Sequence, residues 1–261
     1  MDRKINVTIY NEFLHETTVD AVRAIYPKGI HGAIKEFLEK DGAIGTIRCA
    51  TLADHRETLN REALDDTDVL IWWGHIKHKD VDDGVVALVT DRVLQGMGLI
   101  VLHSGHDSKP FHALMGVNTG KLRWREAGEK VRLWNIAKNH PITQGLSETF
   151  VVPHDETYGE PFEIPDPEQI IFLSWFQGGE VFRSGCTWRR GEGKIFYLQN
   201  GHETFPVYHQ KEIQTVITNA VKWACAPQRN CVIDRGGPNA AALESYTLED
   251  GGEFTPVTSR Q

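Results

Sequence analysis

Short, entirely apolar segments alternate with helix-like segments along much of this chain, and this alternation constrains its fold more than any other feature. Residues 69–73 and 99–102 are such segments, and an amphipathic stretch at 82–95 lies between them. A strand that is apolar at every position is covered on both faces, as in a parallel sheet flanked by helices. The alternation therefore predicts a doubly wound, mainly parallel α/β sheet of the flavodoxin-like class. The further elements expected from this pattern are strands at 5–10, 44–52 and 194–199 and helices at 20–40, 58–64 and 207–224.

The middle of the chain shows a different pattern. Strand-like segments follow one another without intervening helices, at 121–126, 130–136, 149–153, 169–176 and 181–189. This predicts an antiparallel insertion at about 120–190 within a single domain at 1–226. Residues 227–261 contain few large apolar side chains. We expect them to form an extended tail that packs on the surface or on a neighbour, which suggests a homo-oligomer.

Composition excludes two classes of partner. The net charge of −8 opposes binding to the phosphates of a nucleic acid. No apolar run approaches the roughly 20 residues that span a bilayer, and the N-terminus lacks the apolar core of a signal peptide. The four cysteines show no CxxC spacing. We therefore expect a cytoplasmic protein with reduced thiols, without a nucleic-acid or membrane partner.

Histidines follow the apolar strands at the point where each strand ends. His75 follows the strand at 69–73, His103 follows the one at 99–102, and His202 lies just past the one at 194–199. The carboxyl ends of parallel strands lie along one edge of a sheet, where ligands bind. Imidazole is a common ligand of transition metals. The sequence thus predicts a divalent metal site at His75, His103 and His202, with zinc as the first choice and manganese as the alternative.

Carboxylates near these strand ends complete the predicted site. Glu156 and Glu203 are candidates for a fourth ligand or for proton transfer, and we assign them, with His106, catalytic roles. Glu12 follows the first strand and is assigned to substrate binding. A lone histidine is more often a hydrogen-bonded structural residue, but a set at three strand ends reverses that expectation. The remaining histidines form a second group that includes His15, His31, His78 and His154, and a group expected to be solvated, which comprises His55, His112, His140 and His209.

Two other side chains have alternative interpretations. Ser104 lies beside His103 at a strand-to-helix turn, but a nucleophile elbow has glycine two residues before the serine, where Leu102 stands. Backbone N–H donation to a substrate oxygen is therefore the better prediction for the turn at Ser104. Trp175 is the tryptophan that we expect to stack on a sugar, although core packing accounts for most tryptophans.

Several motifs together resemble the ThuA family of trehalose utilisation, whose fold is similar to that of class I glutamine amidotransferases. They are Asn11-Glu-Phe-Leu-His-Glu16, Tyr26-Pro-Lys-Gly-Ile-His31, Trp72-Trp-Gly-His75, Gly98-Leu-Ile-Val-Leu-His-Ser-Gly-His106, Tyr158-Gly-Glu160, Ser174-Trp-Phe176, Gly179-Glu-Val-Phe-Arg-Ser-Gly-Cys186 and Gly201-His-Glu203. The resemblance covers most of residues 5–226 and implies a role in the metabolism of trehalose or related sugars. At the turn where amidotransferases carry their nucleophilic cysteine, this chain has His103. Glutamine hydrolysis is therefore not expected.

The leading hypothesis is a metal-dependent isomerase, lyase or hydrolase that acts on trehalose or a keto-disaccharide. The cation would polarise a carbonyl or activate water. The alternative is a non-catalytic sugar-binding or regulatory protein on an amidotransferase-like scaffold. The sequence leaves both open.

Overall fold

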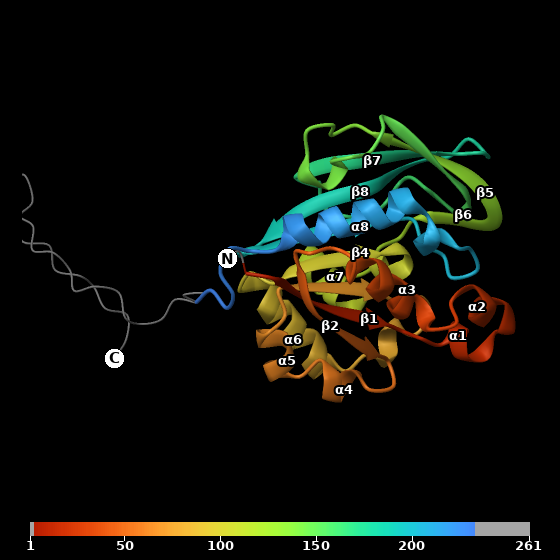
Figure 1. Cartoon of the computed structure of the whole chain (residues 1–261). Helices are drawn as coiled ribbons and strands as arrows, with labels where there is room; N and C mark the ends of the chain where they lie inside the picture. Colours follow the sequence, from red (N-terminus) through yellow and green to blue (C-terminus); the bar gives the residue numbers. More distant parts are fainter. Residues whose placement is uncertain (1–2, 233–261) are drawn as a thin grey trace, which may run out of the picture.

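The computed structural model describes residues 3–232 and contains a single nine-stranded sheet in the order β2-β1-β3-β4-β9-β8-β7-β5-β6 (Figure 1). The strands are β1 (Ile5–Asn11), β2 (Ile44–Thr51), β3 (Val69–Trp73), β4 (Gly98–Leu102), β5 (Arg123–Asn135), β6 (Thr149–Gly159), β7 (Gln169–Phe176), β8 (Val181–Arg190) and β9 (Gly193–Leu198). The first five in spatial order pair in parallel, and every later pair is antiparallel. The predicted α/β fold with an antiparallel extension is confirmed.

Helices and short 3₁₀ segments connect these strands. The α-helices are α1 (His15–Thr18), α2 (Asp20–Ile25), α3 (Gly29–Leu38), α4 (His55–Thr58), α5 (Arg61–Asp65), α6 (Asp83–Leu94), α7 (Lys109–Met115) and α8 (Lys211–Ala224). The 3₁₀ segments are η1 (His78–Asp80), η2 (His103–Asp107), η3 (Pro141–Thr143) and η4 (Val207–His209). Asp82 caps α6 by accepting hydrogen bonds from the backbone N–H groups of Gly84 and Val85. Within the described residues, no helix is both long and apolar enough to cross a membrane.

The parallel half has the strand order β2-β1-β3-β4-β9. With β9 counted as the fifth parallel strand, this is the 2-1-3-4-5 order of flavodoxin-like folds. From β1 the chain runs to β2 on one side and then to β3 on the other side of β1, so the direction of winding reverses between β1 and β3. The crevice at such a reversal, outside the carboxyl ends of the strands, is where open α/β sheets bind ligands. The strand order alone therefore predicts that a ligand binds at the loops after β1 and β3.

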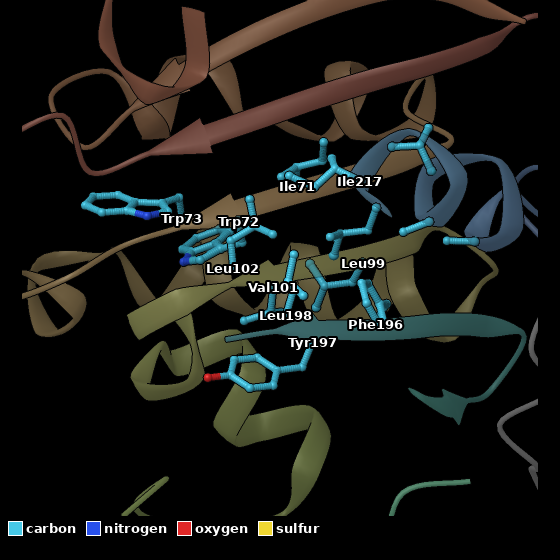
Figure 2. Close-up of a cluster of buried hydrophobic side chains, with 14 of the residues drawn as sticks. Ile71, Trp72, Trp73, Leu99, Val101, Leu102, Phe196, Tyr197, Leu198 and Ile217 are labelled. Carbon is cyan, nitrogen blue, oxygen red and sulfur yellow. The ribbon is translucent and has the colours of Figure 1, made fainter. Parts of the chain in front are cut away.

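The core packs where the parallel strands are covered on both faces. Every residue of β3 and β4 is buried, and so are the aromatic residues of β9 (Figure 2). Trp72 stacks on Tyr10 of the neighbouring strand, with 3.9 Å between the ring centroids. A tryptophan buries roughly 150–250 Å². This rigid layer lies directly beneath the loops that carry the histidines.

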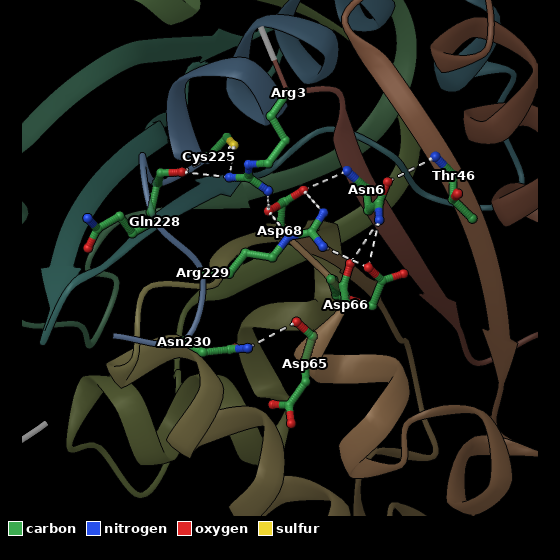
Figure 3. Close-up of polar contacts among 12 residues, drawn as sticks. Arg3, Asn6, Thr46, Asp65, Asp66, Asp68, Cys225, Gln228, Arg229 and Asn230 are labelled. Carbon is green, nitrogen blue, oxygen red and sulfur yellow. Dashed lines mark hydrogen bonds and ion pairs between the residues drawn. The ribbon is translucent and has the colours of Figure 1, made fainter. Parts of the chain in front are cut away.

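A network of charged side chains lies at the amino ends of the parallel strands. Asp68, just before β3, accepts hydrogen bonds from Arg3, from the backbone of Asn6 and from Arg229 (Figure 3). Arg229 therefore holds the segment after α8 against the amino ends of the strands. The expected tail at 227–261 is described only as far as residue 232, and the rest of it lies outside the described residues.

Several predicted boundaries were wrong. The helix expected at 20–40, with an interruption at Pro27-Lys-Gly29, is two separate helices, α2 and α3, because the chain turns at that interruption and Gly29 has a positive φ of 74°. Two strands expected at 121–126 and 130–136 are one strand, β5, with a bulge at Gly128. His55 was expected to be solvated but is buried, because Nδ1 lies 2.7 Å from the carbonyl oxygen of Leu52 and Nε2 accepts from the backbone of Asp82.

Candidate metal centre

Four loops meet at the carboxyl edge of the parallel strands. His15 begins α1 after β1, and His75 follows β3. His103 begins η2 directly after β4, and His202 and Glu203 follow β9. The rings of the three predicted metal ligands converge, since the His75 and His103 centroids are 5.2 and 5.3 Å from that of His202. Their nitrogen atoms, however, fall into two separate groups.

The first group, site A, consists of His15, His75 and Glu203. Oε1 of Glu203 lies 3.0 Å from Nδ1 of His15 and 3.1 Å from Nδ1 of His75. The two Nδ1 atoms are 3.4 Å apart. Zinc binds nitrogen and oxygen at about 2.0–2.2 Å, so neighbouring ligands of a tetrahedral ion lie about 3.3 Å apart. Site A therefore has the dimensions of one face of a zinc coordination tetrahedron.

The second group, site B, consists of His103, Glu156 and His202, all of them buried. Oε2 of Glu156 lies 3.0 Å from Nε2 of His103 and 3.9 Å from Nε2 of His202. Nδ1 of His103 lies 2.7 Å from the carbonyl oxygen of Gln199. That contact requires a proton on Nδ1, so Nε2 keeps a lone pair for a ligand. Site B is thus wider than site A but has the same donor chemistry.

The backbone at His103 is strained. Its φ is 51°, a left-handed conformation that non-glycine residues rarely adopt. Such conformations cost of order 1–3 kcal/mol and cluster at functional sites. The turn directs the imidazole of His103 toward Glu156, at the position where the amidotransferase resemblance implies a nucleophile. No thiol lines the pocket in the part of the chain described here, and burial raises the pKa of Cys186 to about 12.

The two carboxylates of the cluster are ionised despite their burial. Burial alone would raise the pKa of Glu203, but His15, His75 and the nearby imidazole charges hold it well below its usual range. His103 and its neighbours likewise lower the pKa of Glu156 against the effect of burial. Oε2 of Glu203 is buried and has no hydrogen-bond partner among the described residues, and Oε2 of Glu156 faces Nε2 of His103 at 3.0 Å. Buried anionic oxygens of this kind are suited to a cation.

The histidines of the cluster differ in basicity. Burial lowers the pKa of His202 to about 4, which leaves its ring neutral at neutral pH. The contact with Glu203 raises the pKa of His15. Burial lowers the pKa of His103, but Glu156 outweighs that effect and the net shift is upward. Neutral imidazole is the form that binds a metal, so a cation would compete with protons chiefly at His15 and His103.

Asp155 holds the loop that carries His202 and Glu203. Its Oδ1 accepts from the backbone N–H groups of Glu156 and His202, and its Oδ2 accepts from the side chain of Asn200 and the backbone of Gly201. The residue is completely buried, and burial raises its pKa. Asp155 thus fixes the position of ligands in both sites without belonging to either.

The predicted substrate residue Glu12 has a different role in the structure. Its carboxylate accepts backbone N–H groups of His75, Ile76 and Lys77 at 2.8–3.1 Å from Oε2. These bonds fix the turn after β3 and so orient His75. The side chain is buried and occupied, because it holds the protein's own backbone, and this leaves little of it for a substrate.

A pocket of about 480 Å³ opens on the cluster, and its walls carry hydroxyl, imidazole and indole groups. Ser104 and Tyr158 line it with their oxygens 2.9 Å apart, and the Tyr158 hydroxyl is 3.4 Å from Nε2 of His103. His106 also lines it, and burial lowers the pKa of His106 to about 3. His106 is therefore neutral at neutral pH and is a hydrogen-bonding group rather than an acid.

The predicted sugar-stacking residue does not line this pocket. Trp175 lies with Trp134 on the outer face of the antiparallel half, along a separate groove of about 880 Å³. The indole at the mouth of the pocket is Trp124, which is 68% exposed. Buried and exposed residues alternate toward the end of β7, and Trp175 is one of the exposed ones.

Three residues of the site were missed by the sequence analysis. His15 was placed in the second group, although β1 and β3 were both expected and their ends are adjacent in a flavodoxin-like sheet. Tyr158 follows Glu156 by two residues on β6, and alternate residues of a strand share a face. That signal was hidden because the strand was expected to end at residue 153. Trp124 carried no distinguishing signal in the sequence.

Comparison with known proteins agrees with this architecture. The family model for ThuA, described as trehalose utilisation, matches residues 6–224. A protein from Parabacteroides merdae described as ThuA-like has 14% identity and a TM-score of 0.64, and the match covers 90% of this chain and 94% of that one. A Salmonella typhimurium LT2 protein described as cytoplasmic has 14% identity and a TM-score of 0.57, over 85% of this chain and 100% of that one.

The fold also resembles amidotransferase-like domains. A structure of PurLQS from Thermotoga maritima has 12% identity and a TM-score of 0.51, with 84% of this chain and 99% of that chain covered. At these identities the solved structures show the fold alone, and no curated protein matches significantly. The family model spans nearly all of the described sheet, from β1 to α8. The chain therefore belongs to the ThuA family of trehalose utilisation.

Proposed function

We propose that the protein is a metal-dependent enzyme of trehalose or keto-disaccharide utilisation, with a divalent cation bound at site A. The observation that supports this most strongly is the spacing of 3.0–3.4 Å among the donor atoms of His15, His75 and Glu203. Two imidazoles and one carboxylate are a ligand set of catalytic zinc, and they leave a coordination position open. Zinc is the first choice of cation, and manganese is the alternative.

The chemistry available to such a centre follows from the groups around it. A bound cation polarises a carbonyl or lowers the pKa of a water molecule. Glu156 is ionised and lines the pocket, so it is placed to accept a proton. Isomerisation, elimination and hydrolysis of a sugar all fit these parts, while thiol-dependent glutamine hydrolysis does not.

The pocket fits a sugar in size and in lining. Its volume of about 480 Å³ lies within the 300–1,000 Å³ common for small-molecule sites. Ser104, Tyr158 and His106 offer hydrogen bonds, and Trp124 offers an aromatic face at the mouth. The family's link to trehalose supports this substrate class. The expected cytoplasmic location and the homo-oligomer stay predictions.

The test is a turnover assay of the full chain on trehalose and 3-keto-trehalose, after metal removal by a chelator and again after return of zinc or manganese. We expect turnover of one of the two sugars that the chelator abolishes and the metal restores. Turnover that is unchanged by complete metal removal would contradict the proposal. Binding of sugar to the metal-loaded protein without any turnover would favour the non-catalytic sugar-binding or regulatory alternative.

A further inference from the structure

We propose that the cluster is a two-cation centre, in which site B binds a second divalent cation and Glu203 bridges the two. This inference rests on the proposed function, since it takes site A as the first cation site. It adds His103, Glu156 and His202 as ligands rather than as acid or base groups.

The donor sets of the two sites are equivalent. Each site offers two imidazole nitrogens and one carboxylate oxygen within 4.8 Å of one another. At site B the backbone contact of His103 Nδ1 leaves Nε2 free to bind, as is usual for metal-binding histidines. Nδ1 of His202 lies 2.8 Å from the hydroxyl of Thr204 and accepts from the Thr204 backbone N–H at 3.3 Å, so a cation at Nε2 would take the place of the ring proton there. Four histidines and two glutamates thus provide three protein ligands for each cation, and a bridging Glu203 would add a fourth at site B.

Glu203 connects the two sites. Its Oε1 belongs to site A, at 3.0 and 3.1 Å from the two Nδ1 atoms. Its Oε2 lies on the other side, 3.7 Å from Nε2 of His202 in site B. Bridged metal pairs in enzymes are about 3.5–4 Å apart, a separation that one carboxylate can span. The side chain is 4% exposed, and Oε2 has no hydrogen-bond partner in the described part of the chain.

The charge balance of the cluster also favours a second cation. The carboxylates of Glu156 and Glu203 are almost completely buried and lie within 4 Å of the imidazoles of the two sites. An uncompensated buried carboxylate costs several kcal/mol. A cation at site A would bind Oε1 of Glu203, while Oε2 of Glu156 faces the imidazoles of His103 at 3.0 Å and His202 at 3.9 Å. A cation at site B would bind that oxygen directly.

Two cations would change the expected roles at the pocket. Glu156 and His202 line the pocket, so a cation at site B would be open to substrate from the same side as His75. With Glu156 engaged as a ligand it would no longer accept the proton, and the cations would supply that function by lowering the pKa of water at the site. The hydroxyls of Ser104 and Tyr158 would then orient the sugar beside it.

The test measures metal content and coupling in the full chain, with Mn²⁺ as the probe. The protein is stripped with a chelator, reloaded with Mn²⁺ and desalted, and bound metal is counted by mass spectrometry. We expect two Mn²⁺ per chain and the exchange-coupled electron paramagnetic resonance spectrum of a bridged pair. The variants His15→Ala, His103→Ala and the nearly isosteric Glu156→Gln should each retain about one Mn²⁺ and lose the coupling.

His154→Ala is the matched control, because His154 is exposed on the same strand as Glu156 and should keep both ions. A single Mn²⁺ in the wild type that His15→Ala removes and Glu156→Gln keeps would overturn this inference while leaving the proposed function intact. Two ions without magnetic coupling would overturn the bridge. No bound metal at all would overturn both proposals.

Discussion

Two of the hollows in the described structure differ both in size and in the chemistry of their lining. The pocket at the carboxyl edge of the parallel strands is built from imidazoles, carboxylates and hydroxyls, and the groove on the antiparallel half is built from Trp134, Leu173, Trp175 and Val181. The groove is the larger, at about 880 against 480 Å³. Its aromatic residues Trp134 and Trp175 are exposed, and the ionisable residues that line it are Arg132 and the paired Arg183 and Glu160. We therefore assign the proposed chemistry to the smaller pocket, where buried charged groups converge, and not to the larger and more apolar groove.

The largest expected effect is at Glu203, whose carboxylate faces both sites of the cluster. Glu203→Ala removes a donor from site A and should eliminate cation binding there. Loss of one electrostatic stabilising group commonly costs an enzyme about 10²–10³ in kcat. We expect a loss of turnover of at least that size, measured with saturating zinc and the sugar that the wild type converts. If Glu203→Ala kept more than a tenth of wild-type turnover, the reaction would not depend on site A.

Asp155 comes next, because it positions ligands without touching the cation. Asp155→Asn replaces an acceptor by a donor that faces N–H groups and should loosen the loop of His202 and Glu203. Changes behind metal ligands typically cost 10–100-fold in affinity. Competition with a calibrated chelator should show a weakening of that order for zinc. Asp107→Asn, at the exposed rim of the same pocket, serves as control and should change the affinity less than twofold.

His106 provides a test through pH. Its pKa of about 3 lies below the ordinary 6.5, because burial opposes the charged form. Its contribution to stability is therefore complete above pH 6.5 and is lost as the pH falls toward 3. For the metal-free protein, this linkage amounts to about 2 kcal/mol of unfolding free energy between pH 7 and pH 5.

Urea unfolding at the two pH values measures this loss. In His106→Gln the difference should shrink by about 2 kcal/mol. The exposed His154→Gln is the control and should lose as much stability as the wild type. An unchanged pH dependence in His106→Gln would show that His106 is not held neutral by its surroundings.

The smallest effects separate the two hollows directly. Trp124→Ala removes the aromatic face at the pocket mouth and should raise KM for the sugar, with little change in kcat. Aromatic contacts are worth about 0.5–1.5 kcal/mol, which corresponds to roughly 2- to 13-fold. Trp175→Ala in the groove should leave both constants within twofold. The reverse result, with KM sensitive to Trp175 and not to Trp124, would place the sugar in the groove.

The strands of the parallel half could be predicted because their sequence signal is local. Residues 69–73 are apolar throughout and end at a glycine, and the strand occupies those residues. The antiparallel half was harder, because its irregularities imitate strand ends. Gly128 looked like a break between strands but forms a bulge within β5. Pro153 looked like the end of a strand, but β6 is the edge strand of the sheet, where a proline costs no ladder bond on its free side.

The site was predictable in its location and not in its grouping. The topology of parallel strands brings His75, His103 and His202 to one edge, and their rings do converge. Which nitrogen faces which carboxylate depends on rotamers and loop turns that no sequence pattern encodes. The left-handed turn at His103 orients its ring, and the hydrogen bonds that the backbone of the His75 loop donates to Glu12 orient that of His75. Together they place the two rings in different sites.

The most direct test of the central claim is to locate the cation. A crystal of zinc-loaded protein, measured at the zinc absorption edge, should show an anomalous peak between the imidazoles of His15 and His75 and the carboxylate of Glu203. A peak elsewhere, for instance beside Cys225 and Cys231, or no peak at all at the carboxyl edge, would contradict the account.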